Sequence, residues 1–367
     1  MTKRERLTRI LDRQPVDRLA WTTLADTATL SGMDDRRRGM SILEFYRHID
    51  CDILQQGNHH LPPEAWAQYI RRVQPIETSW SSRDDIVERR MVSPWGELAT
   101  VWRKSHPIKY TVTSAEELRL LARIWRESHY EPDPGARASE RRAIDLVGED
   151  GLYLPTLEPS PVQQLIQTDL GLEQFYYYLE DHPSDMTDLM AEMQRCRLQE
   201  CEITAALTAA PALMAIENTS STLTSPRYYR RLSLPHVTEY IDATHRHGKK
   251  IVLHMCGLLH HLLPMLAGAG IDAINGLTPP PVGDCGPEEA LDVLGEDLVQ
   301  LGTTLPAFQE PGATRESIWQ ALDEFYSPRI RRSHMLLWVV ADGLPTSIDR
   351  FESVREWMER QGGGSPA

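Results

Sequence analysis

The sequence has no apolar run of about 18 residues, the length that a membrane-spanning helix requires. It is also short of positive charge: 39 lysine and arginine residues stand against 53 aspartate and glutamate residues, giving a net charge of −14. Proteins that bind nucleic acid present a basic face to the phosphates, so this balance argues against a nucleic-acid partner. We therefore expect no membrane span and no nucleic acid, while a protein partner with a basic surface is compatible with the charge.

Cysteine is scarce, with five residues in a chain of 367. An odd number of cysteines in a chain of this length does not indicate a disulfide framework and favours a reducing compartment. The opening segment, MTKRERLTRILDRQPVDR, alternates charged and apolar residues at helical spacing and has no apolar core of the kind found in signal peptides. These absences predict a cytoplasmic protein.

What the sequence does contain is an alternation of short apolar runs with helical segments, which is regular from residue 151 onward. Strands that alternate with helices predict a parallel sheet. Eight candidate strands include the residues Leu19, Ile53, Tyr153, Ala212, Ile251, Ile271, Leu298 and Leu336. Eight parallel strands close a (β/α)8 barrel, so we expect an α/β protein of the TIM-barrel class.

The N-terminal part of the chain carries more than barrel strands. Residues 2–12 predict an amphipathic helix, and residues 68–110 read as antiparallel strands with a hairpin turn at SPWG. We therefore expect an N-terminal helical extension, the first barrel strands and an inserted β-hairpin arm within residues 1–145. The main βα repeat and the site would follow within 146–361, and a disordered tail at 362–367.

Three short segments carry specific expectations about local structure. The charged run DDRRR at 34–38 is typical of a solvated loop. Residues 258–269, closed by Gly270, predict a helix. Thr346 with Asp349 indicates a capping box that begins the final helix.

The strongest candidate site is the pair His254 and Cys256, which follows the apolar run at 251–253. Alternate residues of an extended chain point the same way, so both side chains can face one point. Imidazole nitrogen and thiolate sulfur are ligands that zinc favours, and three protein ligands with one open position are typical of catalytic zinc. Glu217 and Asp342 follow other predicted strands, which makes them candidate ligands and catalytic carboxylates on the same rim. The alternative is a packed thiol beside a satisfied histidine, with the carboxylates in caps or salt bridges.

Three further polar residues follow strands on this rim: Asn218, Thr278 and Asp284. Such side chains could bind and orient a substrate by hydrogen bonds, and turn formation is the alternative role. The tandem histidines at 59–60 and 260–261 are more typical of unliganded positions.

Several stretches carry a resemblance to a known family. IENTSSTLTSPRYYRRLSLP, HGKKIVLHMCG and AGIDAINGLTPPPVGD are similar to members of the uroporphyrinogen decarboxylase superfamily, and more narrowly to its branch of zinc-dependent, corrinoid-linked methyltransferases. RERLTRILDRQPVDRLAW, SPWGEL and PTLEPSPVQQLIQTDLGLEQFY extend the resemblance over most of the chain. The resemblance implies a (β/α)8 barrel with an N-terminal extension, in agreement with the strand count. It also implies a zinc site made by an H-x-C pair, matched by His254 and Cys256, and a later cysteine.

The chain departs from the family pattern at that later cysteine. The cysteine is expected just after the last strand, before a glycine and a proline, and the segment here reads VADGLPTS, which places Asp342 at that position. A carboxylate ligates zinc at a similar distance but makes a harder site. Cys285 is a rival third ligand, and Glu217 could be a fourth ligand or a proton acceptor.

The resemblance implies a methyltransferase that moves a methyl group between a corrinoid and a metal-activated acceptor. The corrinoid would be methylcobalamin or the group of a corrinoid carrier protein, the metal zinc and the acceptor perhaps tetrahydrofolate. The decarboxylase itself would require an arginine-rich segment near the N-terminus, where this chain reads WTTLADTATLSG. Two alternatives stay open: a decarboxylase-like lyase acting on a non-porphyrin acid, and a non-catalytic barrel that binds a corrinoid.

Overall fold

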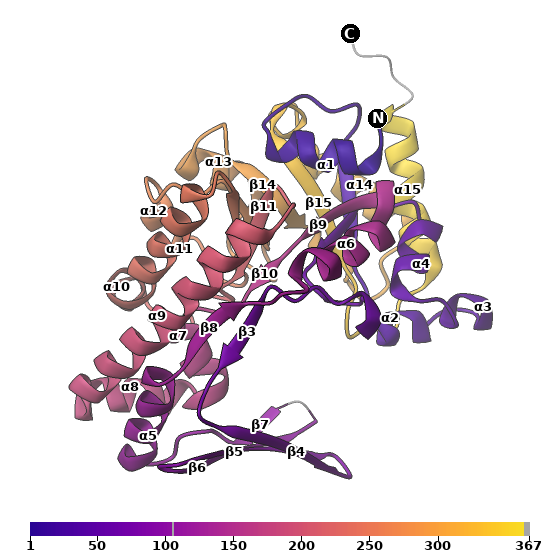
Figure 1. Cartoon of the computed structure of the whole chain (residues 1–367). Helices are drawn as coiled ribbons and strands as arrows, with labels where there is room; N and C mark the ends of the chain where they lie inside the picture. The colour runs from indigo at the N-terminus through magenta and orange to yellow at the C-terminus, as the bar shows by residue number, and fades with distance from the viewer. Residues whose placement is uncertain (105, 363–367) are drawn as a thin grey trace.

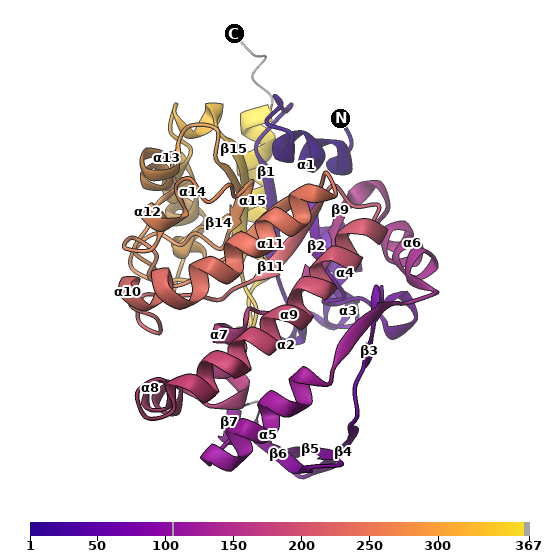
Figure 2. The same ribbon diagram turned by 60° about the vertical axis from the view of Figure 1, so that its left-hand side comes forward.

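The computed structural model describes residues 1–104 and 106–362 of the chain. Within them eight parallel strands form a barrel whose outside is covered by helices (Figure 1, Figure 2). In chain order the strands are β1 (Ala20–Leu24), β2 (Ile53–Gln56), β9 (Gly151–Leu154) continued by β10 (Thr156–Leu157), β11 (Ala212–Ile216), β12 (Lys250–His254), β13 (Ala273–Asn275), β14 (Val299–Thr304) and β15 (His334–Val340). The predicted α/β TIM-barrel class is confirmed, and each of the eight predicted strands is present.

The strand order is that of a barrel, although the hydrogen-bond ladder is interrupted twice. The main ladder runs β1-β15-β14-β13-β12-β11-β10, and β2 pairs with β9. Pro155, which has no N–H, divides the third strand, so β9 pairs with β2 and β10 pairs with β11. On the other side, the N–H of Asp52 just before β2 donates to the carbonyl of Trp21 in β1 at 2.7 Å.

Helix α1 (Lys3–Leu11) closes the amino end of the barrel. Its residues Leu7, Ile10 and Leu11 are at most 1% exposed and share one apolar cluster with side chains from the strands. The strand members of that cluster are Ala20, Leu54, Leu152, Leu154, Ala212, Met214, Val252, Ala273, Val299, Leu301 and Leu336. Burial of each large apolar side chain contributes about 1.5–3 kcal/mol, so α1 is firmly attached.

The remaining helices connect the strands on the outside of the barrel. They are α2 (Thr27–Ser31), α3 (Asp35–Arg38), α4 (Ile42–His48), α6 (Ala136–Val147), α7 (Pro161–Gln164), α8 (Leu172–Asp181), α9 (Pro183–Leu207), α10 (Pro226–Tyr228), α11 (Leu234–Arg246), α12 (Leu263–Leu266), α13 (Pro287–Leu294), α14 (Arg315–Phe325) and α15 (Ile348–Gly362). Figure 2 shows α9 and α11 crossing in front of the strands. Within the described ranges, no helix is both long enough and apolar enough to cross a membrane.

An arm extends beyond the end of the barrel opposite α1 (Figure 1). It begins with β3 (Ile70–Val73) paired to β8 (His129–Pro132) and continues into an antiparallel sheet of β4 (Glu77–Arg83), β5 (Ile86–Ser93), β6 (Gly96–Arg103) and β7 (His106–Lys109). The predicted turn at SPWG joins β5 to β6, and the Ser93 hydroxyl donates to the Gly96 carbonyl at 2.8 Å. Helix α5 (Ala115–Arg126) packs against both this sheet and α9, in a second apolar cluster.

Three local expectations were wrong. Residues 35–38 of the expected loop form the short helix α3, because the Asp34 side chain accepts the N–H of Arg37 as an N-cap. The helix expected at 258–269 shrinks to α12, since Pro264 is tolerated only in the first turn of a helix. At α15 the backbone N–H of Asp349 donates to the hydroxyl of Ser347, so Ser347 takes the capping position expected for Thr346. The predicted tail falls almost entirely on residues 363–367, which lie outside the described part.

Candidate functional site

His254 is the last residue of β12 and lies opposite Asn275, the last residue of β13. Its Nδ1 atom lies 2.5 Å from Oδ1 of Asn275, whose amide nitrogen donates to the carbonyl of Leu301. Because that donation orients the amide, Oδ1 is the acceptor and Nδ1 of His254 carries the proton. The lone pair of Nε2 is then free, as it must be for imidazole to bind a metal. Burial lowers the pKa of His254, which favours this neutral form.

Cys256 lies two residues beyond His254 and is partly buried. Burial raises the pKa of its thiol. The nearest hydrogen-bond partner is Oδ1 of Asn218, 3.8 Å from Sγ. The thiol is therefore protonated at neutral pH unless a metal or base removes the proton.

His254 and Cys256 line one cavity of about 300 Å³ at the carboxyl end of the strands. The other lining residues are Gly276, Thr278, Val282, Thr304, Leu305, Pro306, Gln309, Trp338 and Val340. Most of this wall is apolar, and the Trp338 ring meets the edge of the His254 ring at 6.1 Å between centroids. A mostly apolar cavity with two convergent polar groups is the usual form of a small-molecule site.

Gly276 allows the close approach of β12 and β13 at this point. Its φ is +94°, and a Cβ there would lie 2.6 Å from the carbonyl oxygen of Met255 and 3.1 Å from Cε1 of His254. Both the backbone conformation and the space therefore require glycine. Glycine at this position therefore lets Asn275, the preceding residue, lie against the ring of His254.

Glu217 does not face this cavity. It is 0% exposed and accepts hydrogen bonds from the backbone N–H (3.0 Å) and hydroxyl (2.8 Å) of Ser160, the N-cap residue of α7. Burial raises the pKa of Glu217, against the effect of both hydrogen bonds. The carboxylate joins the end of β11 to the start of α7. Its neighbour Asn218, with φ +37°, is the residue that reaches Cys256.

Asp342 is exposed and lies after β15, with Asp26 and His59. Burial of its carboxyl group and the nearby Asp26 carboxylate raise the pKa of Asp342, while His59 lowers it. Asp26 accepts the N–H of Gly343 at 3.1 Å, which ties this loop to the end of β1. Asp342 is absent from the lining of the His254 cavity.

Of the other predicted site residues, Thr278 lines the cavity, and Asp284 and Cys285 lie outside its lining. Thr278 lines the cavity, where its hydroxyl donates to the Gly276 carbonyl at 3.0 Å. Asp284 accepts the backbone N–H groups of Leu259 and His260, which orders the loop after β12. Cys285 is 0% exposed and lies outside the cavity lining.

The predicted three-ligand metal centre is not assembled in this structure. Across residues 1–104 and 106–362, no three His, Cys, Asp or Glu side chains lie together at a spacing suited to a metal ion. In this structure Asp342 lies near Asp26 and His59 and outside the cavity lining, so its joining His254 and Cys256 stays a prediction. Glu217 and Cys285 do not take its place.

Sequence reasoning missed two residues that matter to the chemistry of this cavity, one behind its wall and one in it. Asn275 orients His254, and Trp338 forms one wall. The available signal was position: Asn275 ends the apolar run at 273–274 as His254 ends its own strand. Trp338 sits within the apolar run MLLWVV, where it could not be told from core.

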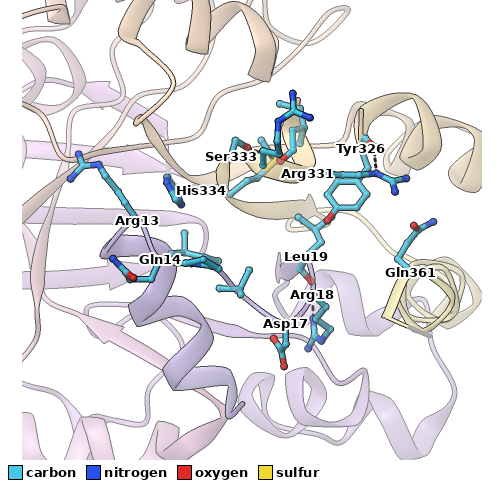
Figure 3. A pocket seen from close by; sticks show the side chains of 16 residues that line it. Arg13, Gln14, Asp17, Arg18, Leu19, Tyr326, Arg331, Ser333, His334 and Gln361 are labelled. Atoms are coloured by element: carbon cyan, nitrogen blue, oxygen red, sulfur yellow. Dashed lines mark hydrogen bonds between the residues drawn. The ribbon is translucent and has the colours of Figure 1, made fainter. Parts of the chain in front are cut away.

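A second cavity, of about 420 Å³, lies at the opposite, amino end of the barrel (Figure 3). Two of its arginines are already bound within the fold: Arg13 donates to the carbonyls of Asp272 and Asp297, and Arg18 pairs with Asp52. In TIM barrels this face serves stability and the carboxyl face carries the chemistry. The cavity of His254 is therefore the better candidate site.

Comparison with known proteins agrees with this placement. Residues 164–277 match the family model described as uroporphyrinogen decarboxylase (URO-D). The predicted resemblance to the uroporphyrinogen decarboxylase superfamily is confirmed. The matched segment includes β11, β12 and β13, and so contains His254, Cys256 and Asn275.

A solved structure shows the same fold over nearly the whole chain. A methyltransferase from Methanosarcina mazei matches with a TM-score of 0.57 and 15% identity, over 98% of this chain and 99% of that one. A D-psicose 3-epimerase from Clostridium cellulolyticum H10, solved with D-tagatose, matches at a TM-score of 0.34 and 10% identity over 62% and 81% of the two chains, which is too distant to inform function. No curated protein matches the chain.

Proposed function

We propose that this protein is a methyltransferase that moves a methyl group between a corrinoid and an acceptor bound in the cavity of His254 and Cys256. The observation that carries the proposal is this pair. A free Nε2 lone pair and a thiol line one largely apolar cavity at the carboxyl end of a barrel. The superfamily match and the fold shared with the Methanosarcina methyltransferase support an enzyme of this general class.

The residues of this cavity fit zinc only in part. An imidazole with a fixed tautomer and a thiol are ligands that zinc favours, but a third protein ligand is not assembled among the described residues. His254 and Cys256 are the residues that would hold the metal. When bound, zinc would supply a Lewis acid that lowers the pKa of the acceptor.

The chain's own residues have definite roles in this proposal. Asn275 keeps the proton on Nδ1 of His254, so that Nε2 presents its lone pair to the cavity. Trp338, Leu305 and Val340 keep that wall apolar, which limits access of water to a reactive nucleophile. Thr278 offers a hydroxyl at the same wall for orienting the acceptor.

The donor and the acceptor are proposed on chemical grounds and on the resemblance. A methyl group on cobalt(III) is electrophilic, so the site must present a nucleophile held in line with the Co–CH₃ bond. Methylcobalamin or a corrinoid carrier protein would supply the methyl group, and tetrahydrofolate is the proposed acceptor. The net charge of −14 is compatible with a carrier that docks through a basic face.

The test follows the visible spectrum of methylcobalamin mixed with zinc-loaded protein, with tetrahydrofolate and thiols offered separately. We expect demethylation that stops on chelation and in His254→Ala, but continues in the control His261→Ala, which changes an exposed histidine. The same reactions are run with a methylated corrinoid protein. Absence of demethylation with either donor, in folded and metal-loaded protein, would refute the proposal.

Decarboxylation is the second candidate, because the matching family model is that of a decarboxylase. Two measurements separate the candidates: metal that survives dialysis favours methyl transfer, and release of CO₂ from a carboxylic acid without bound metal favours the lyase. The proposal of methyl transfer requires the first result and excludes the second.

A further inference from the structure

A third cavity, of about 520 Å³, lies between the carboxyl end of the barrel and the arm. Its walls come from β3, β5 and β8 of the arm, from α7 and α9, and from the loop after β10. It shares no lining residue with the cavity of His254. Its volume is in the range of small-molecule sites.

Three arginines from three different elements line this cavity: Arg72 on β3, Arg89 on β5 and Arg197 on α9. In each of them the Nε atom is buried and has no hydrogen-bond partner within the described residues. A buried N–H donor without a partner is costly. Three arginines with such donors around one cavity make it a candidate site for a ligand that carries oxygen acceptors.

Two of these arginines are neutralised by carboxylates of the protein. Arg197 is 5% exposed and pairs with Glu200 at 2.9 Å, and its other nitrogen donates to Gln164. Arg89 donates to two threonine hydroxyls and lies 3.7 Å from Asp169. Their charges are balanced, although their buried Nε–H groups have no hydrogen-bond partner within the described residues.

Among the three arginines, Arg72 is the one whose positive charge is not balanced by a paired carboxylate within the described residues. Its guanidinium lies 4.0 Å from the centre of the Trp125 ring, and no ion pair to it is formed within the described ranges. Burial lowers the pKa of Arg72, as expected for a charge removed from water without a partner. The Trp125 ring stabilises the cation in part, and an anion bound in the cavity would balance its charge.

The neighbouring residue shows that this placement is specific. Arg71 lies on the opposite face of β3, is exposed, and pairs with Glu131 across the β3–β8 ribbon. The alternation of the strand therefore sends one arginine to solvent and the next into the cavity. Arg72 lies opposite Tyr130, whose hydroxyl accepts from Arg197 at 3.3 Å, so the guanidinium groups converge.

We propose that this cavity binds an oxyanion, a carboxylate or a phosphate carried by a small molecule, through the guanidinium of Arg72, with the guanidinium groups of Arg89 and Arg197 beside it. Guanidinium forks match the planar oxygens of both groups, and hydrogen bonds between charged groups are the strong ones. The inference does not depend on methyl transfer, because it rests on residues that the His254 cavity does not use. A protein that failed every methyl-transfer assay would still bind the anion.

The experiment measures binding of inorganic phosphate and of succinate to the full chain, each compared with chloride at equal ionic strength, by calorimetry and thermal unfolding. We expect at least one oxyanion to bind the wild type with a Kd below about 1 mM and to raise its Tm. Binding of phosphate alone or of succinate alone supports the proposal and identifies the source of the charge. If neither oxyanion exceeds chloride, the proposal is overturned.

The variants separate ligand binding from a structural role of the arginine. Arg72→Gln and Arg72→Met should weaken oxyanion binding about tenfold or more, while the matched control Arg71→Gln should bind as the wild type does. Without an oxyanion, Arg72→Met should unfold at the same or a higher temperature than wild type, because it keeps an apolar contact with Trp125 and removes an unbalanced charge. Equal oxyanion affinity in wild type and either Arg72 variant would overturn the assignment.

Discussion

Oδ1 of Asn275 lies 2.5 Å from Nδ1 of His254, across the last paired residues of β12 and β13. This contact decides which ring nitrogen carries the proton, and it leaves Nε2 free beside the cavity that Cys256 also lines. Gly276 makes the contact possible, because any side chain there would press on the histidine or on the backbone before it.

Asn275→Leu should lower the affinity of the protein for zinc about 10- to 100-fold, the usual effect of losing the group that orients a ligating histidine. Asn275→Asp should restore most of the affinity, because a carboxylate oxygen can accept the Nδ1 proton. Zinc affinity is measured by competition with a chromogenic chelator, with Gln309→Leu as a control that changes another amide of the same cavity. Similar affinities in wild type and Asn275→Leu would contradict the proposed tautomer.

Cys256→Ser should abolish stable zinc binding, because it replaces one of the two ligands that the cavity provides. Cys285→Ser should retain it, since that thiol is buried outside the cavity. Asp342→Ala should also retain it, because Asp342 lies with Asp26 and His59 instead. Metal content of each dialysed variant is measured by mass spectrometry. Metal loss in Asp342→Ala would show that the loop after β15 moves to complete the site.

Much of the fold was predictable, because parallel barrel strands are short apolar runs that recur between helices. The run ALMAI at Ala212–Ile216 is buried on both faces, and a strand was predicted there. Strand β4 was not predicted, since all seven of its residues are exposed and it shows no apolar alternation. The pairing of β3 with β8 was not predictable from local pattern either, because it joins residues 70–73 to residues 129–132, which are far apart in the sequence.

The candidate site was only partly predictable, for a related reason. His254 and Cys256 share a local spacing, so their common direction followed from the geometry of a strand. Asp342, Glu217 and Asn275 come from other strands, and the loops that follow those strands decide where such side chains point. A sequence shows that a carboxylate follows a strand, but not that Ser160 binds Glu217 from another loop.

Leu7→Ala should destabilise the protein by about 2–5 kcal/mol, because Leu7 is fully buried where α1 closes the barrel and truncation would leave a cavity. Arg9→Ala, on the exposed side of α1, removes an exposed ion pair with Glu5 and a 3.4 Å hydrogen bond to the Pro15 carbonyl, and should cost less than about 1 kcal/mol. Urea unfolding followed by circular dichroism gives both values. Equal effects of the two changes would show that α1 does not pack as described.

Glu217→Gln tests the environment of the buried carboxylate through the pH dependence of stability. Burial raises the folded-state pKa of Glu217 above its ordinary value of about 4.3, so between these two pKa values the folded protein binds more protons than the unfolded chain. Stability of the wild type therefore falls as pH rises through that window, and the glutamine variant lacks this contribution.

The measured quantity is the Tm of wild type minus the Tm of Glu217→Gln, which should be highest at low pH and should decline as the pH is raised through the window. Other buried carboxylates, such as Glu200 and Asp169, are present in both proteins and cancel in the difference, provided that the sites act independently. A difference that instead grows with pH would mean that the two hydrogen bonds from Ser160 outweigh burial and hold the pKa of Glu217 below its ordinary value. Glu217 would then be an ionised carboxylate held at the start of α7, and its protonation would destabilise the junction between β11 and that helix.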